Sequence, residues 1–209
     1  METNSVENAR KDLYLLLNRN YPKSYALRFV GDHYNLKNED RYLLSRMVFP
    51  KEYIMETRKK KASLKEIKGS NLFIDGYNVI ITTESILMGK AFRSMDGLMR
   101  DTRNVSNKFR VTKNTLEAVG LIFDVLERYP PKGTIFYLDK MMRQSGRLSE
   151  NIRISLKERN LEGDSDTVEN VDYTLKNKGG IIATNDSAII IQVNRIIDLP
   201  SKVKTSRES

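Results

Sequence analysis

Three aspartates follow short apolar runs, each at a place where an expected strand ends in, or runs into, the acid. Asp75 ends Asn-Leu-Phe-Ile-Asp, Asp139 ends Ile-Phe-Tyr-Leu-Asp, and Asp186 follows Ile-Ile-Ala-Thr-Asn. The carboxyl ends of the strands in an open parallel α/β sheet form the crevice where ligands bind, so these carboxylates are predicted to converge. A simpler interpretation stays open for Asp139, because an aspartate after a strand commonly forms a turn.

Converging carboxylates repel one another in a partly desolvated cleft unless a cation or a proton compensates their charge. The chain has no cysteine and a single histidine, His33, which excludes thiolate and multi-histidine metal sites. Magnesium and manganese prefer carboxylate and water oxygens. The acidic residues therefore predict a site for Mg²⁺ or Mn²⁺.

Hydrophobic periodicity and turn residues indicate the elements that position these acids. Buried strands are expected over 71–81, 134–138, 180–184 and 194–199, and helices over 115–129 and 167–178. Strands that alternate with helices and lack polar alternation predict an α/β fold with a parallel sheet and helices on both faces. Asp166 is expected in the first turn of the helix over 167–178, where the helix dipole alone would favour an acid.

The chain before this region has a different pattern. Three short amphipathic helices are expected, over 5–18, after Ser24 and after Asn38, and Pro50 ends the third segment. This pattern predicts a small all-α domain over 1–50, a basic helical connector over 51–69, the α/β domain over 70–200 and a flexible tail over 201–209.

The net charge of +9 favours polyanionic partners, nucleic acid above all. Lys59, Lys60 and Lys61 form a basic run that fits either a solvated helix face or a surface that follows phosphates. No apolar stretch approaches the roughly 20 residues of a membrane span, and the N-terminus is polar. We therefore expect no membrane span and no signal peptide, and a cytoplasmic location.

The run Phe-Ile-Asp-Gly-Tyr-Asn-Val-Ile over 73–80 resembles the opening strand of NYN-domain nucleases, a branch of the PIN-like superfamily. The resemblance covers about 71–199 and implies a PIN-like (Rossmannoid) sheet and metal-dependent hydrolysis of phosphodiester bonds, largely in RNA. It implies metal binding by Asp75, Asp139, Asp166 and Asp186, with Asn78 supporting the site. The N-terminal helices resemble those of an uncharacterised family in which they precede a PIN-like domain.

Four further acids are reserve candidates for metal binding: Asp164, Asp172, Asp96 and Asp101. The last two lie in a long insertion over 81–114 that departs from a compact NYN pattern, and a solvated loop of mixed charge is the simpler interpretation of this segment. The arginines expected to contact a nucleic-acid backbone are Arg100, Arg103 and Arg110 in the insertion and Arg143, Arg147 and Arg153 after the second strand.

Two other functions stay open. An inactive PIN-like domain that binds nucleic acid without cleaving it would share every basic feature. The run Asp-Ser-Asp-Thr-Val over 164–168 also matches the Asp-x-Asp-x-Thr/Val signature of haloacid-dehalogenase-like phosphatases. That signature needs a hydrophobic strand directly before its first aspartate, and the preceding residues here are largely charged, so the phosphatase is the weaker alternative.

Overall fold

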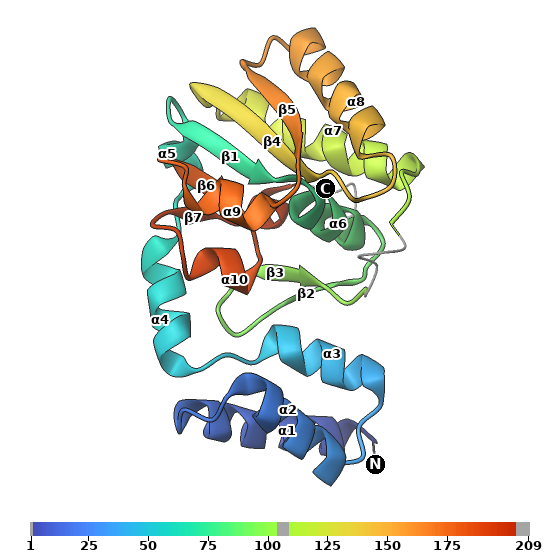
Figure 1. Ribbon diagram of the computed structural model, residues 1–209, viewed down its shortest axis with the longest axis vertical. Helices are drawn as coiled ribbons and strands as arrows, with labels where there is room; N and C mark the ends of the chain where they lie inside the picture. Colours follow the sequence, from blue (N-terminus) through green and yellow to red (C-terminus); the bar gives the residue numbers. More distant parts are fainter. Residues whose placement is uncertain (1, 104–108, 204–209) are drawn as a thin grey trace.

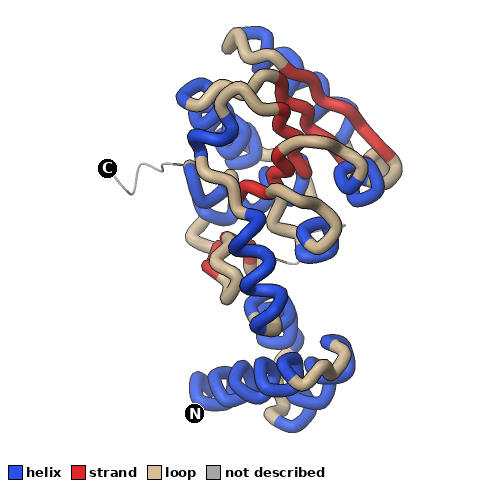
Figure 2. The backbone as a smooth tube through the Cα atoms, turned by 90° about the vertical axis from the view of Figure 1, so that its left-hand side faces the viewer, coloured by secondary structure: helices blue, strands red, loops and turns tan. Residues whose placement is uncertain are grey.

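The computed structural model describes residues 2–103 and 109–203. It has a helical N-terminal part and an α/β part built on a five-stranded parallel sheet (Figure 1). Viewed from the side, the helical part lies beyond one end of the α/β part, and α4 runs between the two (Figure 2). None of the helices in the described residues combines the length and the apolar character that a membrane span requires.

The N-terminal part consists of α1 (Glu2–Asn18), α2 (Lys23–His33) and α3 (Asn38–Met47). Its core is apolar and is built around Ala9, Leu13, Leu17, Ala26, Val30 and Leu44. The three predicted helices are confirmed, but the predicted cap is not, because Pro22 rather than Ser24 occupies the N-cap of α2. Proline suits this position, since its fixed φ and missing N–H do not hinder the first helical turn.

The segment after Pro50 packs against the α/β part. It forms α4 (Lys51–Lys60) and the short α5 (Leu64–Ile67). The Lys60 Nζ donates to the Ile190 carbonyl at 2.8 Å, and the Ala62 amide donates to the Ile196 carbonyl at 2.7 Å. The predicted basic connector is therefore helical over most of its length and is attached to the sheet.

The sheet contains five parallel strands in the order β5-β4-β1-β6-β7. Their bounds are β1 Asn71–Asp75, β4 Gly133–Asp139, β5 Gly163–Val168, β6 Ile181–Ala183 and β7 Ile196–Ile197. Counted along the chain, the order is third, second, first, fourth, fifth. The order of the strands thus reverses between β1 and β6, and ligands in open α/β sheets bind at such a switch point.

Helices cover both faces of this sheet, as predicted (Figure 1). On one face α6 (Gly76–Leu87), α7 (Lys113–Arg128) and α8 (Ser145–Glu158) enclose the main apolar core. On the other, α9 (Val171–Lys176) and α10 (Ser187–Ile190) cover a smaller cluster, and a 3-10 turn, η2 (Pro200–Lys202), follows β7. The α/β class is therefore confirmed.

Two predicted elements have different bounds. The apolar run over 71–81 is not one strand, because the chain turns after Asp75 and α6 begins at Gly76. The helix predicted over 167–178 is also wrong: β5 extends through Val168, and α9 begins only at Val171. Hydrogen bonding of β5 to β4 decides the backbone of this polar segment, overriding a sequence that suits a helix start.

The insertion over 81–114 is not a solvated loop in its described part. It completes α6 and forms a hairpin of β2 (Ala91–Arg93) and β3 (Met99–Asp101). Arg100 is buried and bonds Asp96 through both terminal nitrogens, at 2.8 and 2.7 Å, and its guanidinium lies 4.7 Å from the centre of the Phe49 ring. The hairpin therefore packs against the segment that joins α3 to α4.

Gly76 is required where β1 turns into α6. A Cβ at this position would lie 2.5 Å from the Leu138 Cδ2 and 2.9 Å from the Tyr137 carbonyl oxygen. We predict that Gly76→Ala lowers the free energy of unfolding by about 1–3 kcal/mol, because α6 must move away from β4. Gly120→Ala in α7 is the matched control, since its Cβ would meet open space.

The control substitution should stabilise the protein by up to about 1 kcal/mol through helix propensity. Urea unfolding of both variants measures the difference. Equal effects of the two substitutions would contradict the close packing of α6 on β4.

Candidate active site

Asp75 is the central residue of the acidic edge. It ends β1, at the switch point of the sheet, and its side chain is only 7% exposed. The Thr184 hydroxyl, which follows β6, donates to the Asp75 Oδ2 at 2.8 Å. The two carboxyl strand ends that flank the switch point are thus joined by one side-chain hydrogen bond.

The loop after β6 is fixed by further polar contacts. The Asp186 amide donates to the Thr184 Oγ1 at 3.1 Å, and the Asn185 amide donates to the Asn78 Oδ1 at 2.8 Å. The Asn185 side chain in turn donates to the Met99 carbonyl and to the Asp198 Oδ1. Asn78 therefore supports the site by holding this loop, and Asn185 is a site residue that the sequence did not single out.

The electrostatics of Asp75 follow from its surroundings. Burial, with the nearby charges of Asp186 and Asp172 adding to it, raises the pKa of its carboxyl to about 7, against the lowering effects of the Thr184 hydroxyl and the Asn78 amide. Partial burial raises the pKa of Asp172 as well, and Asp186 adds to it. Three carboxyl groups thus interact at the switch point, and no basic side chain of the described residues contributes to the pKa changes of Asp75 and Asp172.

Asp172 belongs to this group although it was only a reserve candidate. It lies in the first turn of α9, whose N-cap Asn170 accepts a hydrogen bond from the Tyr173 amide at 2.8 Å. The late start of α9 brings Asp172 near Asp75 and Asp186: its charge adds to the raised pKa of Asp75, and the charge of Asp186 adds to its own raised pKa. The sequence signal was present as an acid near a helix start, but the helix was predicted four residues too early.

One carboxylate oxygen of Asp186 has a structural contact, and the other can bind a ligand. Its Oδ1 accepts the Ala188 amide at 2.7 Å and so caps α10. Among the described residues no donor within hydrogen-bond distance engages its Oδ2. One oxygen of Asp186 therefore remains for a water or a cation.

Asp139 lies farther from this group than predicted. Asp75 is paired with Tyr137, so Asp139 is two residues farther along the neighbouring strand, about 8 Å away between Cα atoms. Its Oδ1 accepts the Met141 amide at 2.8 Å, which is the turn interpretation left open by the sequence. Burial, with the charge of Asp139 adding to it, raises the pKa of Tyr77 to about 12.

Asp166 is not in a helix but in β5, at the edge of the sheet. It is paired with Tyr137, which in turn is paired with Asp75. Two strand spacings, about 10 Å, therefore separate Asp166 from Asp75, with Tyr137 between them. The alternation of side chains along the strands places Asp166 on the same face as Asp75. Asp166 is exposed, however, and its charge does not contribute to the raised pKa of Asp75.

These positions bear on metal binding. Within 2–103 and 109–203, no group of three acidic or histidine side chains is close enough to hold one ion. A single cation bound directly by Asp75, Asp139, Asp166 and Asp186 together is therefore not what the structure provides. The group that remains is Asp75, Asp172 and Asp186, with the Thr184 hydroxyl between them.

The reserve acids other than Asp172 have structural partners. Asp96 is buried against Arg100, and Asp101 accepts from the Arg46 side chain at 2.8 Å. Asp164 is the second residue of β5 and accepts from Arg153 at 2.8 Å. Because Asp164 lies at the amino end of its strand, it does not occupy the position that the phosphatase signature requires.

The basic residues predicted to contact nucleic acid also differ in whether they have partners within the protein. Arg100 is buried and is corrected to a structural role. Those with side-chain or backbone partners are Arg103, Arg153, Lys59, Lys60 and Lys61. Arg110, Arg143 and Arg147 are exposed, and their contacts with a nucleic-acid backbone stay predictions.

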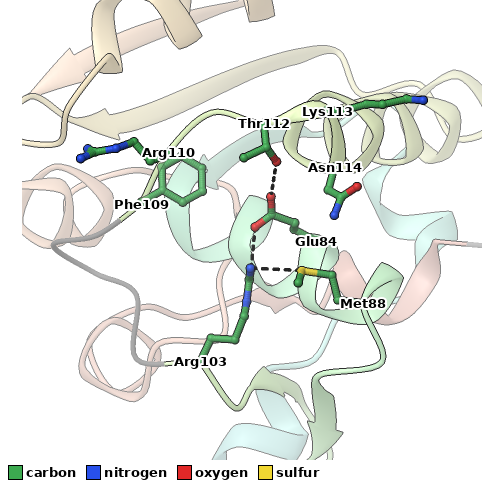
Figure 3. Close-up of a pocket in the computed structure, with 8 residues that line it drawn as sticks. All are labelled: Glu84, Met88, Arg103, Phe109, Arg110, Thr112, Lys113 and Asn114. Carbon is green, nitrogen blue, oxygen red and sulfur yellow. Dashed lines mark hydrogen bonds and ion pairs between the residues drawn. The ribbon is translucent and has the colours of Figure 1, made fainter.

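A separate cavity of about 350 Å³ lies beside the distal half of α6 (Figure 3). In its wall the Glu84 carboxylate accepts from Arg103 at 2.6 Å and from Thr112 at 3.2 Å, and Met88 and Phe109 supply apolar surface. Glu84 is nine residues beyond Asp75, about 13 Å along the helix. The cavity is therefore distinct from the acidic group. Glu84 holds α6 against the start of α7 through Thr112 and Thr115, and against the segment after β3 through Arg103.

Comparisons with known proteins give a family but no activity. Residues 64–202 match the family described as a domain of unknown function (DUF5616), and residues 5–61 match a protein of unknown function (DUF434). An uncharacterized protein of Methanocaldococcus jannaschii is 38% identical over 198 residues, which cover 93% of this chain and 94% of that protein. No solved structure matches.

The raised pKa of Asp75 predicts a pH dependence of stability. The folded protein binds this proton more tightly than the unfolded chain, whose value is near 3.8. The resulting stabilisation is complete below pH 3.8 and is lost as the pH rises through about 7. Asp75→Asn removes this ionisation. In chelator at pH 8, its free energy of unfolding should therefore exceed that of the wild type by up to about 4 kcal/mol.

Thermal unfolding from pH 4 to pH 9 measures this effect. The advantage of Asp75→Asn should shrink toward pH 4. Asp164→Asn is the matched control: it loses an exposed ion pair with Arg153 and should change stability by under about 1 kcal/mol, without a gain above pH 7. A destabilised Asp75→Asn protein at pH 8 would show that the charged carboxylate is well accommodated.

Proposed function

This chain belongs to the DUF5616 family, and we propose that it is a metal-dependent nuclease with a PIN-like active site that hydrolyses phosphodiester bonds in RNA. The observation that carries the proposal is the buried carboxylate of Asp75, which faces two other carboxyl groups at the switch point of the sheet. Crowded acids in a partly dry site are costly unless a cation compensates them.

The fold supports the same interpretation. A parallel sheet in the order third, second, first, fourth, fifth is a doubly wound arrangement whose ligand crevice lies at the ends of β1 and β6. Asp75 and Asp186 follow these two strands. The Asp-Gly-Tyr-Asn run over 75–78 supports the PIN-like assignment, and the choice of RNA comes from that resemblance together with the positive charge.

The residues fit a divalent cation that keeps most of its water ligands. Asp75 and Asp186 would hold Mg²⁺ or Mn²⁺, and Asp172 would act through a water, since magnesium binds through one or two carboxylates and retains several waters. A bound cation would supply a water of lowered pKa and neutralise negative charge on the phosphate. All the protein atoms that would bind the metal are oxygens, which suits magnesium and manganese.

The surrounding side chains have distinct parts in the reaction. The Thr184 hydroxyl fixes the orientation of the Asp75 carboxylate. Asp172, whose pKa is raised, accepts the proton of the attacking water. The water oxygen bonds to phosphorus, and the bond from phosphorus to the leaving oxygen breaks. The leaving oxygen takes up a proton from bulk water, and Asp172 returns its own proton to bulk water. Arg143 and Arg147 hold the flanking phosphates.

A second candidate is a PIN-like domain that binds nucleic acid without cleaving it. The separation of Asp139 and Asp166 from Asp75 favours it, because fewer carboxylates converge than the resemblance implies. Metal-dependent cleavage distinguishes the two candidates.

We predict that the protein cleaves an end-labelled RNA pool with Mg²⁺ or Mn²⁺ and not with chelator. Asp75→Asn should reduce the rate at least about 100-fold, because it removes charge from the cation site, and Asp172→Asn about 10-fold or more, because it removes the proton acceptor. Asp164→Asn, on the same face but paired with Arg153, should retain activity. Parallel reactions with DNA test the preference for RNA.

Cleavage that survives Asp75→Asn would contradict the proposed site. The absence of cleavage for the wild type on every substrate, with nucleic-acid binding retained, would favour the inactive alternative. Loss of activity in Asp164→Asn as well would place the reaction elsewhere on this face of the sheet.

Metal binding can be tested without activity. At pH 8, saturating Mn²⁺ should raise the melting temperature of the wild type, because an ion that binds only the folded state stabilises it in proportion to RT ln(1 + [L]/Kd). Asp75→Asn should show a much smaller rise, whereas Asp164→Asn should match the wild type. Equal shifts in all three proteins would show that the ion binds elsewhere.

A further inference from the structure

The outer face of α2 exposes a row of rings. Tyr25 is 71% exposed and Phe29 is 64% exposed, Tyr21 precedes the N-cap Pro22, and His33 ends the helix. We define the α2 ring face as Tyr21, Tyr25, Phe29 and His33 together with Arg19 and Arg28. Large aromatic side chains this exposed and this regularly spaced mark an interaction surface.

The spacing of these rings follows from the helix. Residues four apart lie on one side, about 6 Å apart along the axis. The Phe29 and His33 rings are nearly parallel, with centroids 6.3 Å apart and an interplanar angle of 10°. Two successive stacking steps of about 3.4 Å each span a distance similar to the separation of these two rings. The flat rings of a ligand can therefore stack on these side chains.

The charge around the rings is mostly positive. Residues 13–31 contain no Asp or Glu, and they contain Arg19, Lys23 and Arg28. The Arg28 side chain is 83% exposed, and Asp32, at 3.9 Å, is its acidic neighbour. Lys23 is instead directed inward, with its Nζ on the Val48 carbonyl. The surface is therefore complementary to a ligand that combines flat rings with negative charge.

We propose that the α2 ring face binds single-stranded nucleic acid by stacking unpaired bases on Tyr25, Phe29 and His33 while Arg19 and Arg28 contact the phosphates. Aromatic platforms within a basic surface bind single strands with little sequence preference, because every base has a π-face. A duplex presents no free base faces, so it is disfavoured.

A second copy of the chain fits this face less well. A two-fold contact would place Arg19 and Arg28 of both copies in one interface, and the acid on this face, Asp32, already pairs with Arg28 and Arg41 within its own chain. The α2 ring face lies in the helical part, at the end of the molecule remote from the sheet (Figures 1 and 2). The proposal therefore does not rest on the nuclease site.

The test is binding of fluorescein-labelled oligo(U) and oligo(dT) of about 20 nucleotides, longer than a single binding site, and of a matched duplex. Fluorescence anisotropy with full-length protein in chelator prevents cleavage. Tyr25→Ala/Phe29→Ala should weaken single-strand binding at least about tenfold. Arg19→Ala and Arg28→Ala should each reduce the salt dependence by about one unit of slope.

Two further variants separate stacking from other effects. Phe29→Leu keeps an apolar side chain without a ring, so it should weaken binding, whereas Phe29→Trp should retain it. Ile154→Ala, at an exposed apolar position on α8, is the control and should bind as the wild type does. Circular dichroism melts of each variant establish that it is folded.

Three outcomes would overturn the proposal. The first is unchanged binding by the Tyr25→Ala/Phe29→Ala protein. The second is no binding of single strands at about 50 mM salt, where electrostatic attraction is strong. The third is a concentration-dependent dimer in sedimentation that Tyr25→Ala/Phe29→Ala abolishes, which would identify the face as a contact between copies. Because all binding is measured without metal, none of these outcomes depends on the nuclease proposal.

Discussion

The hydrogen bond between Thr184 and Asp75 is the interaction on which the architecture of the site depends. It crosses the switch point of the sheet, joining the ends of β1 and β6, and it places a carboxylate where burial disfavours its charge. A fold does not keep such a group for stability, since a neutral side chain would be less costly there. The arrangement is intelligible if a cation completes it.

A continuous set of polar contacts connects this edge to the helical part. Asn185 reaches from the edge to Met99 of β3 and to the buried Asp198, and Asp198 in turn accepts the Met99 amide at 2.9 Å. The next residue of the hairpin, Arg100, is buried against Phe49. The insertion thus has a structural role, because it fixes both the loop after β6 and the position of the N-terminal helices.

Several features of the fold could be predicted from the sequence because local patterns determine them. The strands that end at Asp75 and Asp139 and the helix α7 follow from uninterrupted apolar patterns. The second half of the α/β part was harder, since β5 is a polar edge strand that gains its conformation from pairing with β4. That single error moved Asp166 into a helix and obscured the orientation of Asp172.

The insertion was misjudged for a different reason. Its alternating charges suit a solvated loop, and only the tertiary structure shows that Asp96 and Arg100 neutralise each other in the interior. Asn185 was missed because an asparagine between Thr184 and Asp186 has no periodicity or motif of its own. The register of neighbouring strands, which sequence patterns do not define, sets how far Asp139 and Asp166 lie from Asp75.

The most direct test of the account is the location of a bound cation. Crystals soaked in Mn²⁺ should give an anomalous difference peak about 2.1 Å from a carboxylate oxygen of Asp75, on the side of Asp186 and Asp172, with water completing the coordination. A fully occupied ion elsewhere, or an acidic edge that stays without a peak at saturating Mn²⁺, would contradict the claim that these carboxylates form a metal site.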